Sequence, residues 1–414
     1  MSGRSFAPVW RVSEPKEWPQ VPKYMSVSQL NNIEACPLRW ALASAQYAGI
    51  WDRSGYPGRP QTSSIVGRIV HLSLKTIIMA LARAGCPSMK DPNTTAVLRE
   101  LGGYTKIIND CTRSILSEES NNPRAEHLNE IVERVVLSKV PEMRESVQTL
   151  LTKIRLHPRA MPLRIDKSAN YKRSALSFGS HPEVILCVDK LGWKGVADLI
   201  NLSEKNCEIV DFKTGEPNEE HAFQLRVYSL LWALDTELNP RSRLADTLTL
   251  SYREGEVHIK APSSEELQAI ERDLTKRTCA VFEALAVLPP EAKPSKEACC
   301  YCSVRQLCND YWKSSTQRHL DNEGLLGGDV ADIELTITDC LGPASWDAIV
   351  ESSRVLTPGK KIVLRTALDE TNLKIGNRIR VLDCYATAAG DDGQPAVATL
   401  SSYSEVFLVE EGKC

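Results

Sequence analysis

The alternation of hydrophobic and polar residues divides the chain into a helical first part, a mixed central part and a strand-rich final part. A first helix is predicted after Ser26 or Ser28, either of which can cap it. Its apolar residues recur every three to four positions and form one stripe: Leu30, Ile33, Cys36 and Trp40. A longer helix is predicted over residues 62–84, with Gly85 as its stop signal, and two or three more over residues 94–156.

The central part consists of short, β-branched segments that are typical of strands. Four strands are predicted: residues 184–188, 195–201, 208–212 and 247–252. A helical pattern over residues 221–238 separates the last two. Another follows over residues 264–285, behind a capping sequence that begins at Ser263. This order of elements predicts an α/β core, β-β-β-α-β, that a further helix closes.

Residues 329–414 contain further strand patterns, and Gly327-Gly328 before them is typical of a linker. The predicted strands are residues 333–338, 361–366, 378–385, 396–401 and 405–409. Turn sequences occur at Pro358-Gly359 and at residues 391–393. Short strands with such turns predict a small β-barrel, for which an oligonucleotide-binding (OB) fold is one candidate.

The composition is that of a soluble globular protein, with 42% hydrophobic and 25% charged residues. The length of 414 residues suggests two or three domains. The sequence has no uninterrupted run of about 18 apolar residues, so no membrane-spanning helix is predicted. The polar segment 1–20 lacks the pattern of a secretory signal. We therefore expect a cytoplasmic protein without disulfides.

Charge is distributed unevenly, although the net charge is only −3. Residues 320–414 carry a balance of −8, which leaves +5 for the rest of the chain. This acidity argues against nucleic-acid binding by the final part and favours a role in docking a partner. A basic run after the predicted helices fits either a solvated loop or a phosphate-contacting patch: Lys153, Arg155, Arg159, Arg164, Lys167, Lys172 and Arg173.

Two neighbouring predicted strands each carry one carboxylate in apolar surroundings, Asp198 and Asp211. Lys213 follows Asp211 by two residues, so both side chains project from the same face of the strand. A buried Asp needs a partner, and carboxylate oxygens suit Mg²⁺ or Mn²⁺, which can polarise a phosphodiester and lower the pKa of a bound water. Lys213 could hold that water or stabilise the developing charge. For this pair alone, an Asp–Lys salt bridge on a half-exposed strand is the simpler interpretation.

Three further features favour a site at these strands. His71, four residues after Gly67, could be a neutral imidazole ligand near the carboxylates, although a histidine in a helix is more often a core residue. Gln224 and Tyr228 share one face of the next predicted helix and could point together at a substrate backbone. Glu183, at the start of the first strand, is another carboxylate that could reach the same site.

Cysteines at positions 299, 302 and 308 have the spacing C-x2-C-x5-C, which is typical of metal ligands. A fourth thiolate must come from elsewhere, and Cys36 is the best remote candidate. Zinc and an iron–sulfur cluster both take four thiolates, and the spacing alone does not distinguish them. Cys300 could replace Cys299 with poorer spacing. The other eight of the 13 cysteines show no ligand spacing and are interpreted as structural.

Together these motifs resemble the RecB-type branch of the PD-(D/E)XK nuclease superfamily. Within that branch they are most similar to the iron–sulfur exonucleases, which include the AddB nuclease domain and the CRISPR-associated exonucleases. The segment from Tyr24 to Trp40 resembles that family's first-cysteine helix. The other motifs follow in the family's order over roughly residues 21–320: Gly67 to His71, Gly195 to Asp198, Asp211-Phe212-Lys213, Gln224 to Tyr228, and the cysteine triplet.

The resemblance implies a restriction-endonuclease-like fold over residues 21–320, in which helices flank a mixed sheet and a helical insertion covers about residues 86–175. Residues 1–20 would be an N-terminal extension, and the acidic domain 329–414 is not part of the family core. The implied ligands of Mg²⁺ or Mn²⁺ are His71, Asp198, Asp211 and the backbone carbonyl of Phe212. Asp198, Asp211 and Lys213 would be catalytic, and Gln224 and Tyr228 would position DNA. A [4Fe–4S] cluster would be held by Cys36, Cys299, Cys302 and Cys308.

The leading hypothesis is a metal-dependent DNA nuclease, an exonuclease on single strands or DNA ends, in DNA repair and recombination or in antiviral defence. A second hypothesis is a DNA-binding or scaffolding subunit of a helicase–nuclease complex, whose nuclease site depends on a partner. A helicase or defence-complex partner could then dock on the C-terminal domain. A third hypothesis is a zinc-stabilised RNA-processing enzyme.

Overall fold

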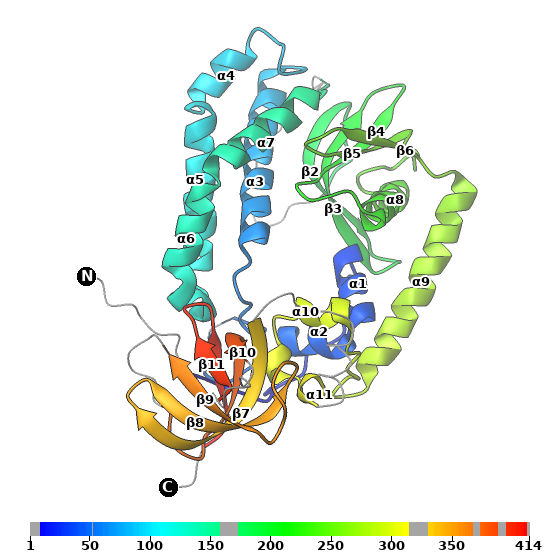
Figure 1. The fold of residues 1–414 in the computed structure, drawn as a ribbon. Coiled ribbons are helices and arrows are strands. Elements are labelled where there is room, and N and C mark those ends of the chain that lie inside the picture. Colours follow the sequence, from blue (N-terminus) through cyan, green and yellow to red (C-terminus); the bar gives the residue numbers. More distant parts are fainter. Residues whose placement is uncertain are drawn as a thin grey trace.

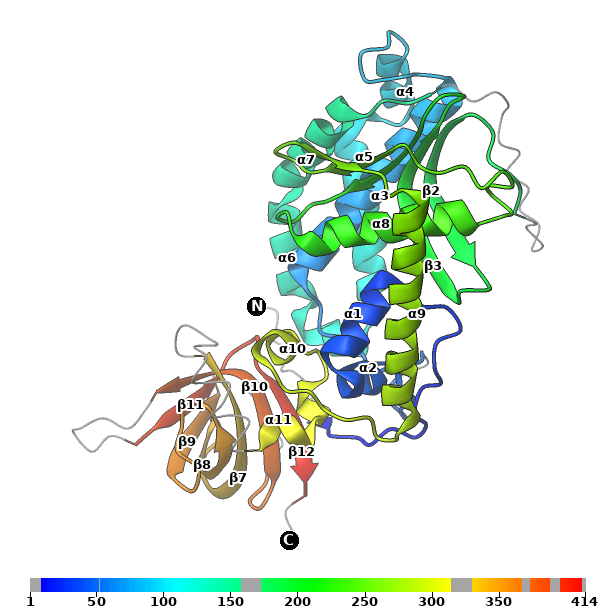
Figure 2. The ribbon, with the colours of Figure 1, turned by 90° about the vertical axis from the view of Figure 1, so that its right-hand side faces the viewer.

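The computed structural model describes residues 9–51, 53–157, 173–313, 330–366, 373–387 and 395–411. A sheet with helices on both faces forms the larger part of the molecule, and a β-barrel lies at the opposite end (Figure 1). The short helices α2 (Pro37–Ser44), α10 (Lys296–Cys300) and α11 (Asn309–Trp312) lie between these two parts, as the turned view also shows (Figure 2). Gly327-Gly328, residues 391–393 and most of the basic run fall outside the described residues.

The first part of the chain is helical, as the periodicity predicts. Its helices are α1 (Val27–Ala35), α2 (Pro37–Ser44), α3 (Thr62–Ala84), α4 (Thr94–Glu100), α5 (Gly103–Glu119), α6 (Asn129–Ser138) and α7 (Val140–Lys153), with a 3-10 turn, η1 (Pro123–Leu128), before α6. Ser26 caps α1, since its hydroxyl accepts a hydrogen bond from the N–H of Gln29. The single helix predicted up to Trp40 was wrong, because Cys36 ends α1 and Pro37 begins α2.

α3 has the predicted bounds and ends at Gly85, whose φ of 73° is in the left-handed region. By length and composition, with a mean hydropathy of 1.7, this helix could also cross a membrane. Half of that apolar window is buried inside the protein, where α3 packs against α5, α7 and β2. We therefore interpret α3 as a core helix.

The central sheet has the strand order β2-β3-β4-β5-β6. Its strands are β2 (Gly179–Val188), β3 (Trp193–Leu202), β4 (Cys207–Phe212), β5 (Thr247–Ser251) and β6 (Glu256–Lys260). β4 and β5 are parallel and are joined through α8 (Glu219–Leu234), whereas the other neighbours are antiparallel. The four predicted strands are confirmed. The edge strand β6 was not predicted, because three of its five residues are polar and none of its side chains is buried.

The two faces of the sheet are covered by different helices. α1, α8 and α9 (Ser264–Ala286) cover one face with a core that includes Trp193 and Trp232. α3 to α7 cover the other face, where Leu199, Val210 and Phe212 join the helical core. The mixed α/β fold with flanking helices is thus confirmed, and β3 and β4 lie between two apolar layers.

The final part contains a closed barrel of β7, β8, β9, β11 and β10, in that order, with β10 paired back to β7. The bounds are β7 (Val330–Gly342), β8 (Ser345–Ser353), β9 (Lys361–Thr366), β10 (Arg378–Thr387), β11 (Val397–Leu400) and β12 (Glu405–Glu410). β9 and β11 are parallel. β12 extends the sheet from β10 and also pairs with β1 (Trp10–Arg11), so residues 10–11 lie beside residues 407–408. β8 was missed in the sequence, although the turn at Gly359 was predicted.

Candidate active site and cysteine pocket

A row of carboxylates crosses the sheet where β3 and β4 begin to separate. Leu199 pairs with Val210, and continuing that antiparallel register by one residue places Asp198 opposite Asp211. The register of β2 and β3 places Glu183 opposite Asp198. At this point a side chain takes the place of a backbone acceptor between the two strands. Oδ2 of Asp198 accepts a 2.7 Å hydrogen bond from the backbone N–H of Phe212. The sheet itself therefore brings the two predicted carboxylates together.

His71 reaches the same row from α3. Its Nδ1 lies 3.7 Å from Oδ1 of Asp198. Burial lowers the pKa of His71, but contact with Asp198 and the charges of Asp198 and Asp211 outweigh burial, so the pKa is raised overall. Gly67, one turn earlier, faces the loop after β4: an added Cβ would lie 3.3 Å from Oγ1 of Thr214. A small residue here lets α3 approach the carboxylates closely.

Asp211 is the most perturbed carboxylate of the row. Burial, and then the charge of Asp198, raise the pKa of Asp211 to about 6 although Lys213 opposes the shift. The Nζ of Lys213 lies 2.7 Å from Oδ2 of Asp211. Among the described residues, however, none donates a well-aligned hydrogen bond to that oxygen. A buried carboxylate oxygen without such a donor, beside a second carboxylate and an imidazole, fits a divalent cation.

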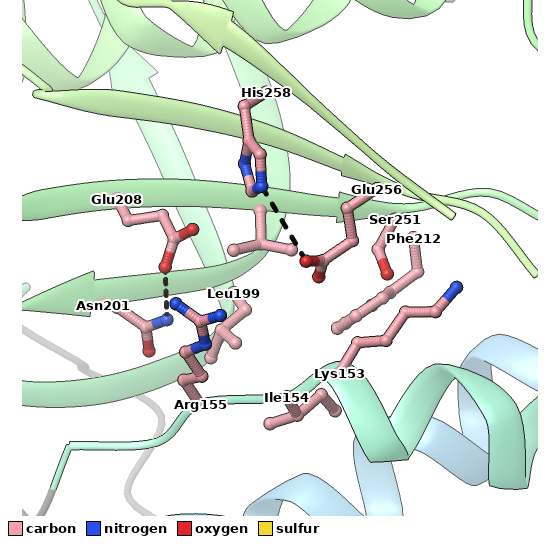
Figure 3. Close-up of a pocket in the computed structure, with 11 residues that line it drawn as sticks. Lys153, Ile154, Arg155, Leu199, Asn201, Glu208, Phe212, Ser251, Glu256 and His258 are labelled. Atoms are coloured by element: carbon pink, nitrogen blue, oxygen red, sulfur yellow. Dashed lines mark hydrogen bonds and ion pairs between the residues drawn. The ribbon is translucent and has the colours of Figure 1, made fainter.

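Glu208 on the same strand provides a contrast. Its Oε2 accepts a 3.0 Å hydrogen bond from Asn201, and its Oε1 accepts a 2.7 Å hydrogen bond from Thr249. Figure 3 shows Glu208 facing Asn201 in a pocket whose other walls include Phe212 and Ser251. Since both oxygens have protein donors, Glu208 is a structural residue, whereas Asp211 retains the capacity to bind a cation.

Lys213 is held by a short chain of hydrogen bonds from α8. Its Nζ donates to Oε1 of Gln224 at 2.6 Å, and Nε2 of Gln224 donates to the hydroxyl of Tyr228 at 2.7 Å. Burial raises the pKa of Tyr228, so its hydroxyl stays protonated. Gly195 makes this arrangement possible, because an added Cβ would lie 2.5 Å from Cε1 of Tyr228. Gln224 and Tyr228 do point together, as predicted, but their direct contact is with Lys213.

Polar residues outside the motifs also surround this site. Nδ1 of His221 lies 2.8 Å from the Tyr252 hydroxyl, and burial, followed by the nearby charge of Lys213, lowers the pKa of His221. The Nζ of Lys75, one turn after His71, lies 3.4 Å from Oε2 of Glu183. The sequence patterns did not indicate His221, Tyr252 or Lys75 as part of this site. Spacing along α3 could have indicated Lys75, but nothing in the sequence relates positions 221 and 252.

The predicted cysteines form a second cluster, away from the carboxylates. Cys36 lies between α1 and α2, and the other three follow α9 in α10 (Lys296–Cys300) and the irregular segment after it. All four line one pocket: Cys36, Cys299, Cys302 and Cys308. Burial raises the pKa of Cys302 to about 11 and that of Cys308 to about 12. Four thiols around one pocket are a donor set for zinc or an iron–sulfur cluster.

At the carboxylate site and in the cysteine pocket, the candidate metal ligands lie near one another but do not form a preformed coordination shell. Within the parts of the chain that the structure describes, no three His, Cys, Asp or Glu side chains are arranged to hold one metal ion. Binding at either place would therefore draw side chains together. The side chain of Cys300, the alternative to Cys299, lies outside the described set.

A family model described as the PD-(D/E)XK nuclease superfamily matches residues 24–309. The matched range contains every candidate residue described above, from Cys36 to Cys308, and stops before the barrel. The chain belongs to the PD-(D/E)XK nuclease superfamily. PD-(D/E)XK nucleases are typically metal-dependent and use Mg²⁺ or Mn²⁺.

Other comparisons add little to the PD-(D/E)XK assignment. No curated protein matches the chain. Among 17 matching chains of solved structures, one titled "Crystal structure of SSO0001" is 22% identical, with a TM-score of 0.19. That match covers 31% of this chain and 59% of the matched chain.

Proposed function

We propose that the protein is a Mg²⁺- or Mn²⁺-dependent deoxyribonuclease that acts as an exonuclease on single-stranded DNA or DNA ends. The observation that carries this proposal is the pair of the partly buried Asp198 and the buried Asp211, with Lys213 2.7 Å from Asp211 and His71 3.7 Å from Asp198. These four residues come from one helix, two strands and the position that directly follows β4. A simple Asp–Lys salt bridge would not need all four of them.

Each residue has a distinct role in this proposal. His71, Asp198, Asp211 and the backbone carbonyl of Phe212 would hold the cation. When bound, the cation would polarise the phosphodiester and lower the pKa of a water nucleophile. Lys213, oriented by Gln224, would place its positive charge against the phosphate as negative charge develops there. Tyr228 fixes the amide of Gln224 through the 2.7 Å hydrogen bond, so both residues act on DNA mainly through Lys213.

We also propose a [4Fe–4S] cluster at the cysteine pocket. The supporting observation is that Cys36, from the start of the domain, lines one pocket with three cysteines from its end. A cluster there would join α1 and α2 to the segment that follows α9. Zinc is the alternative occupant, and the iron content and visible absorbance of anaerobically purified protein distinguish the two.

The proposal also includes an OB-like fold for the barrel and a cellular role for the protein. The closed order β7-β8-β9-β11-β10, with β9 and β11 parallel, supports an OB-like barrel. We place the protein in the cytoplasm, in DNA repair and recombination or in antiviral defence, with a helicase or defence-complex partner docking on the C-terminal domain.

A nuclease assay of the isolated protein tests the activity. The anaerobically purified chain is incubated with Mn²⁺ and end-labelled single-stranded DNA, double-stranded DNA or RNA. We expect cleavage of DNA, with products that shorten progressively from an end. Cleavage only after addition of a helicase partner would favour the scaffolding alternative, and cleavage of RNA alone would contradict the proposal.

A further inference from the structure

The segment that carries Cys302 and Cys308, residues 302–309, has little regular structure of its own. It contains one 3-10 turn, η2 (Arg305–Leu307), and leads into the short helix α11 (Asn309–Trp312). We call residues 302–309 the cysteine loop. Because the loop has few helical or strand hydrogen bonds, its backbone carbonyls need other donors.

Three arginines supply those donors. Nη1 of Arg305 donates to the carbonyl of Cys302 at 3.3 Å, and Nη1 of Arg380 donates to the carbonyl of Gln306 at 2.7 Å. Arg124, from η1, donates to the carbonyl of Ser303. Arg380 also donates to the side chain of Asn309 at 2.8 Å. The three arginines come from the loop, the barrel and the helical region, and all of them bond to the loop.

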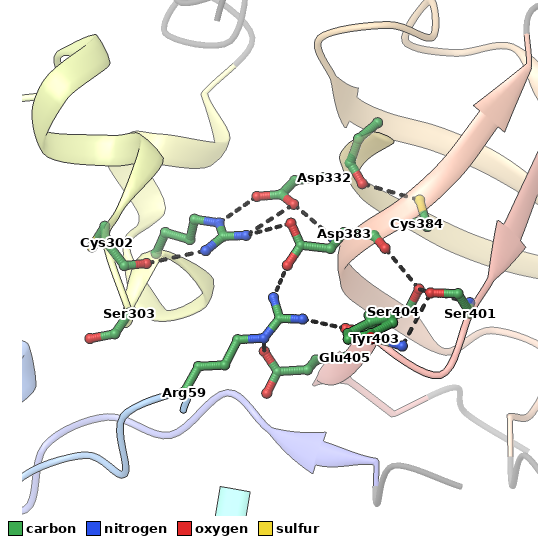
Figure 4. A network of polar contacts seen from close by, with 12 residues as sticks. Arg59, Cys302, Ser303, Asp332, Asp383, Cys384, Ser401, Tyr403, Ser404 and Glu405 are labelled. Carbon is green, nitrogen blue, oxygen red and sulfur yellow. Dashed lines mark hydrogen bonds and ion pairs between the residues drawn. The ribbon is translucent and has the colours of Figure 1, made fainter. Parts of the chain in front are cut away.

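Each of these arginines is in turn held by a carboxylate of the C-terminal part. Arg305 pairs with Asp332 at 2.6 Å, and Arg380 pairs with Glu334 at 2.8 Å. Arg124 and Glu405 form a two-pronged pair at 2.7 and 2.8 Å in which both side chains are fully buried. Figure 4 shows Asp332, Asp383 and Glu405 facing Arg59 and the segment with Cys302 and Ser303. We call Asp332, Glu334 and Glu405 the barrel carboxylates.

The geometry of this network favours a positioning role over a purely stabilising one. A buried ion pair adds little net stability compared with apolar packing, but it fixes the relative placement of the groups that it joins. A planar guanidinium can bond a carboxylate and a carbonyl at the same time in fixed directions. In addition, Arg305 and Arg39 line the cysteine pocket, so they place positive charge beside the thiols.

We propose that the barrel carboxylates, acting through Arg124, Arg305 and Arg380, position the cysteine loop, so that the barrel is a structural part of the cysteine site. The presence of an iron–sulfur cluster is part of the proposed function, on which this inference rests. The positioning of Cys302 and Cys308 by the arginines can be tested without the cluster. The three arginines are positioning residues, and loss of their carboxylate partners releases the loop while Cys36, on the other side of the pocket, keeps its place.

The test compares Asp332→Asn and Glu334→Gln with a matched control, Asp347→Asn. Asp347, on β8, also has a cationic partner, Lys361 at 2.6 Å, but that lysine is exposed and has no hydrogen bond to the cysteine loop among the described contacts. Release of iron to a chelator is followed by visible absorbance. We expect release to be about 10- to 100-fold faster in the two test variants than in the control. Equal rates in all three proteins would overturn the proposal.

A second measurement separates this proposal from that of the cluster. If the wild-type protein binds no iron, the cluster fails, but alkylation of the metal-free protein still tests the positioning of the loop. Cys302 and Cys308 should react at least about 10-fold faster in Asp332→Asn than in Asp347→Asn, because a lost charged hydrogen bond favours local opening of the loop, and Cys36 should be unchanged. Equal acceleration at Cys36 would indicate general unfolding and overturn the proposal. Arg305→Lys, which keeps the charge but not the planar fork, should show an intermediate effect.

Discussion

Asp211 and Cys302 are both buried candidate ligands, but different kinds of structure hold them. Asp211 is on β4, where its backbone is paired with Leu250 of β5, and the pairing of β4 with β3 extends to Val210, one residue before it. Cys302 is in an irregular loop whose carbonyls are bonded by arginines from elsewhere in the chain. The first site is therefore built by local register, and the second by long-range ion pairs. Changes in the barrel should affect the second site and spare the first.

The largest expected effect is on catalysis at the first site. Asp211→Asn should reduce DNA cleavage by roughly 10³-fold or more, because it removes a charged ligand from the reacting centre. The unfolding free energy of the metal-free protein should not fall, since a buried and poorly bonded carboxylate is removed. Glu208→Gln on the same strand is the control, and it should cleave DNA while losing some stability. Equal loss of cleavage in both variants would mean that the strand, and not the carboxylate, is responsible.

The next effect is on stability at the junction with the barrel. Arg124→Ala removes the two-pronged partner of the buried Glu405 and leaves it only the longer contact with Arg59, at 3.7 Å. The unfolding free energy, measured by urea denaturation, should fall by about 3–5 kcal/mol. Replacing both residues, with Arg124→Met and Glu405→Leu together, should recover most of that loss. A double variant as unstable as the single one would show that the pair is needed for more than charge balance.

A smaller effect separates two glycines near the active site. Gly195→Ala should destabilise the protein by about 1–3 kcal/mol, because the new Cβ would overlap the ring of Tyr228. Gly67→Ala should be milder, since its new Cβ meets only Oγ1 of Thr214 at 3.3 Å. Thermal unfolding measures both changes. If Gly67→Ala lowered the stability more than Gly195→Ala, the contact between Gly195 on β3 and Tyr228 on α8 would not be the tighter of the two.

The two regions should also differ in the sign of their pH dependence. Burial raises the pKa of Asp211 from 3.8 to about 6, so its ionised form opposes folding, and this contribution lowers stability as pH rises through that interval. Burial raises the pKa of Glu405, but the charge of Arg124 and the hydrogen bond to it outweigh burial and hold the pKa below its usual value. The Glu405 contribution is therefore present above the ordinary pKa of a glutamate and is lost as pH falls.

Urea denaturation of the metal-free protein across about pH 4 to pH 7 measures both contributions. Relative to Asp211→Asn, the wild-type protein should become less stable as pH rises. Relative to Glu405→Gln, it should become more stable. Slopes of the same sign in the two comparisons would contradict the assignment of these pKa shifts.

Local patterns predicted most of the nuclease domain. α3 was predicted with its observed bounds, and the four main strands of the central sheet follow from their β-branched residues. The motif residues His71, Asp198, Asp211 and Lys213 also come together as expected, since adjacent strands and one helix suffice to align them. β8 was missed because its Asp, Glu and Ser residues interrupt the apolar pattern, although its alternate residues fill the barrel core.

The long-range ion pairs could not be predicted from the sequence. The acidity of the final part was interpreted as a surface for a partner, yet Asp332, Asp383 and Glu405 pair with arginines of the same chain outside the barrel. No sequence pattern relates Arg124 to Glu405, because 281 positions separate them and neither is in a motif. The prediction of an external partner stays a prediction, and it has to rely on other residues of the barrel.

The most direct test of the nuclease assignment measures cation binding and cleavage in the same samples. Wild-type protein and Lys213→Ala are titrated with Mn²⁺, the bound ion is counted by electron paramagnetic resonance, and cleavage of end-labelled single-stranded DNA is followed in parallel. The predicted result is that Lys213→Ala binds Mn²⁺ like the wild-type protein but does not cleave. Full cleavage by Lys213→Ala, or the absence of Mn²⁺ binding by the wild-type protein, would contradict the account.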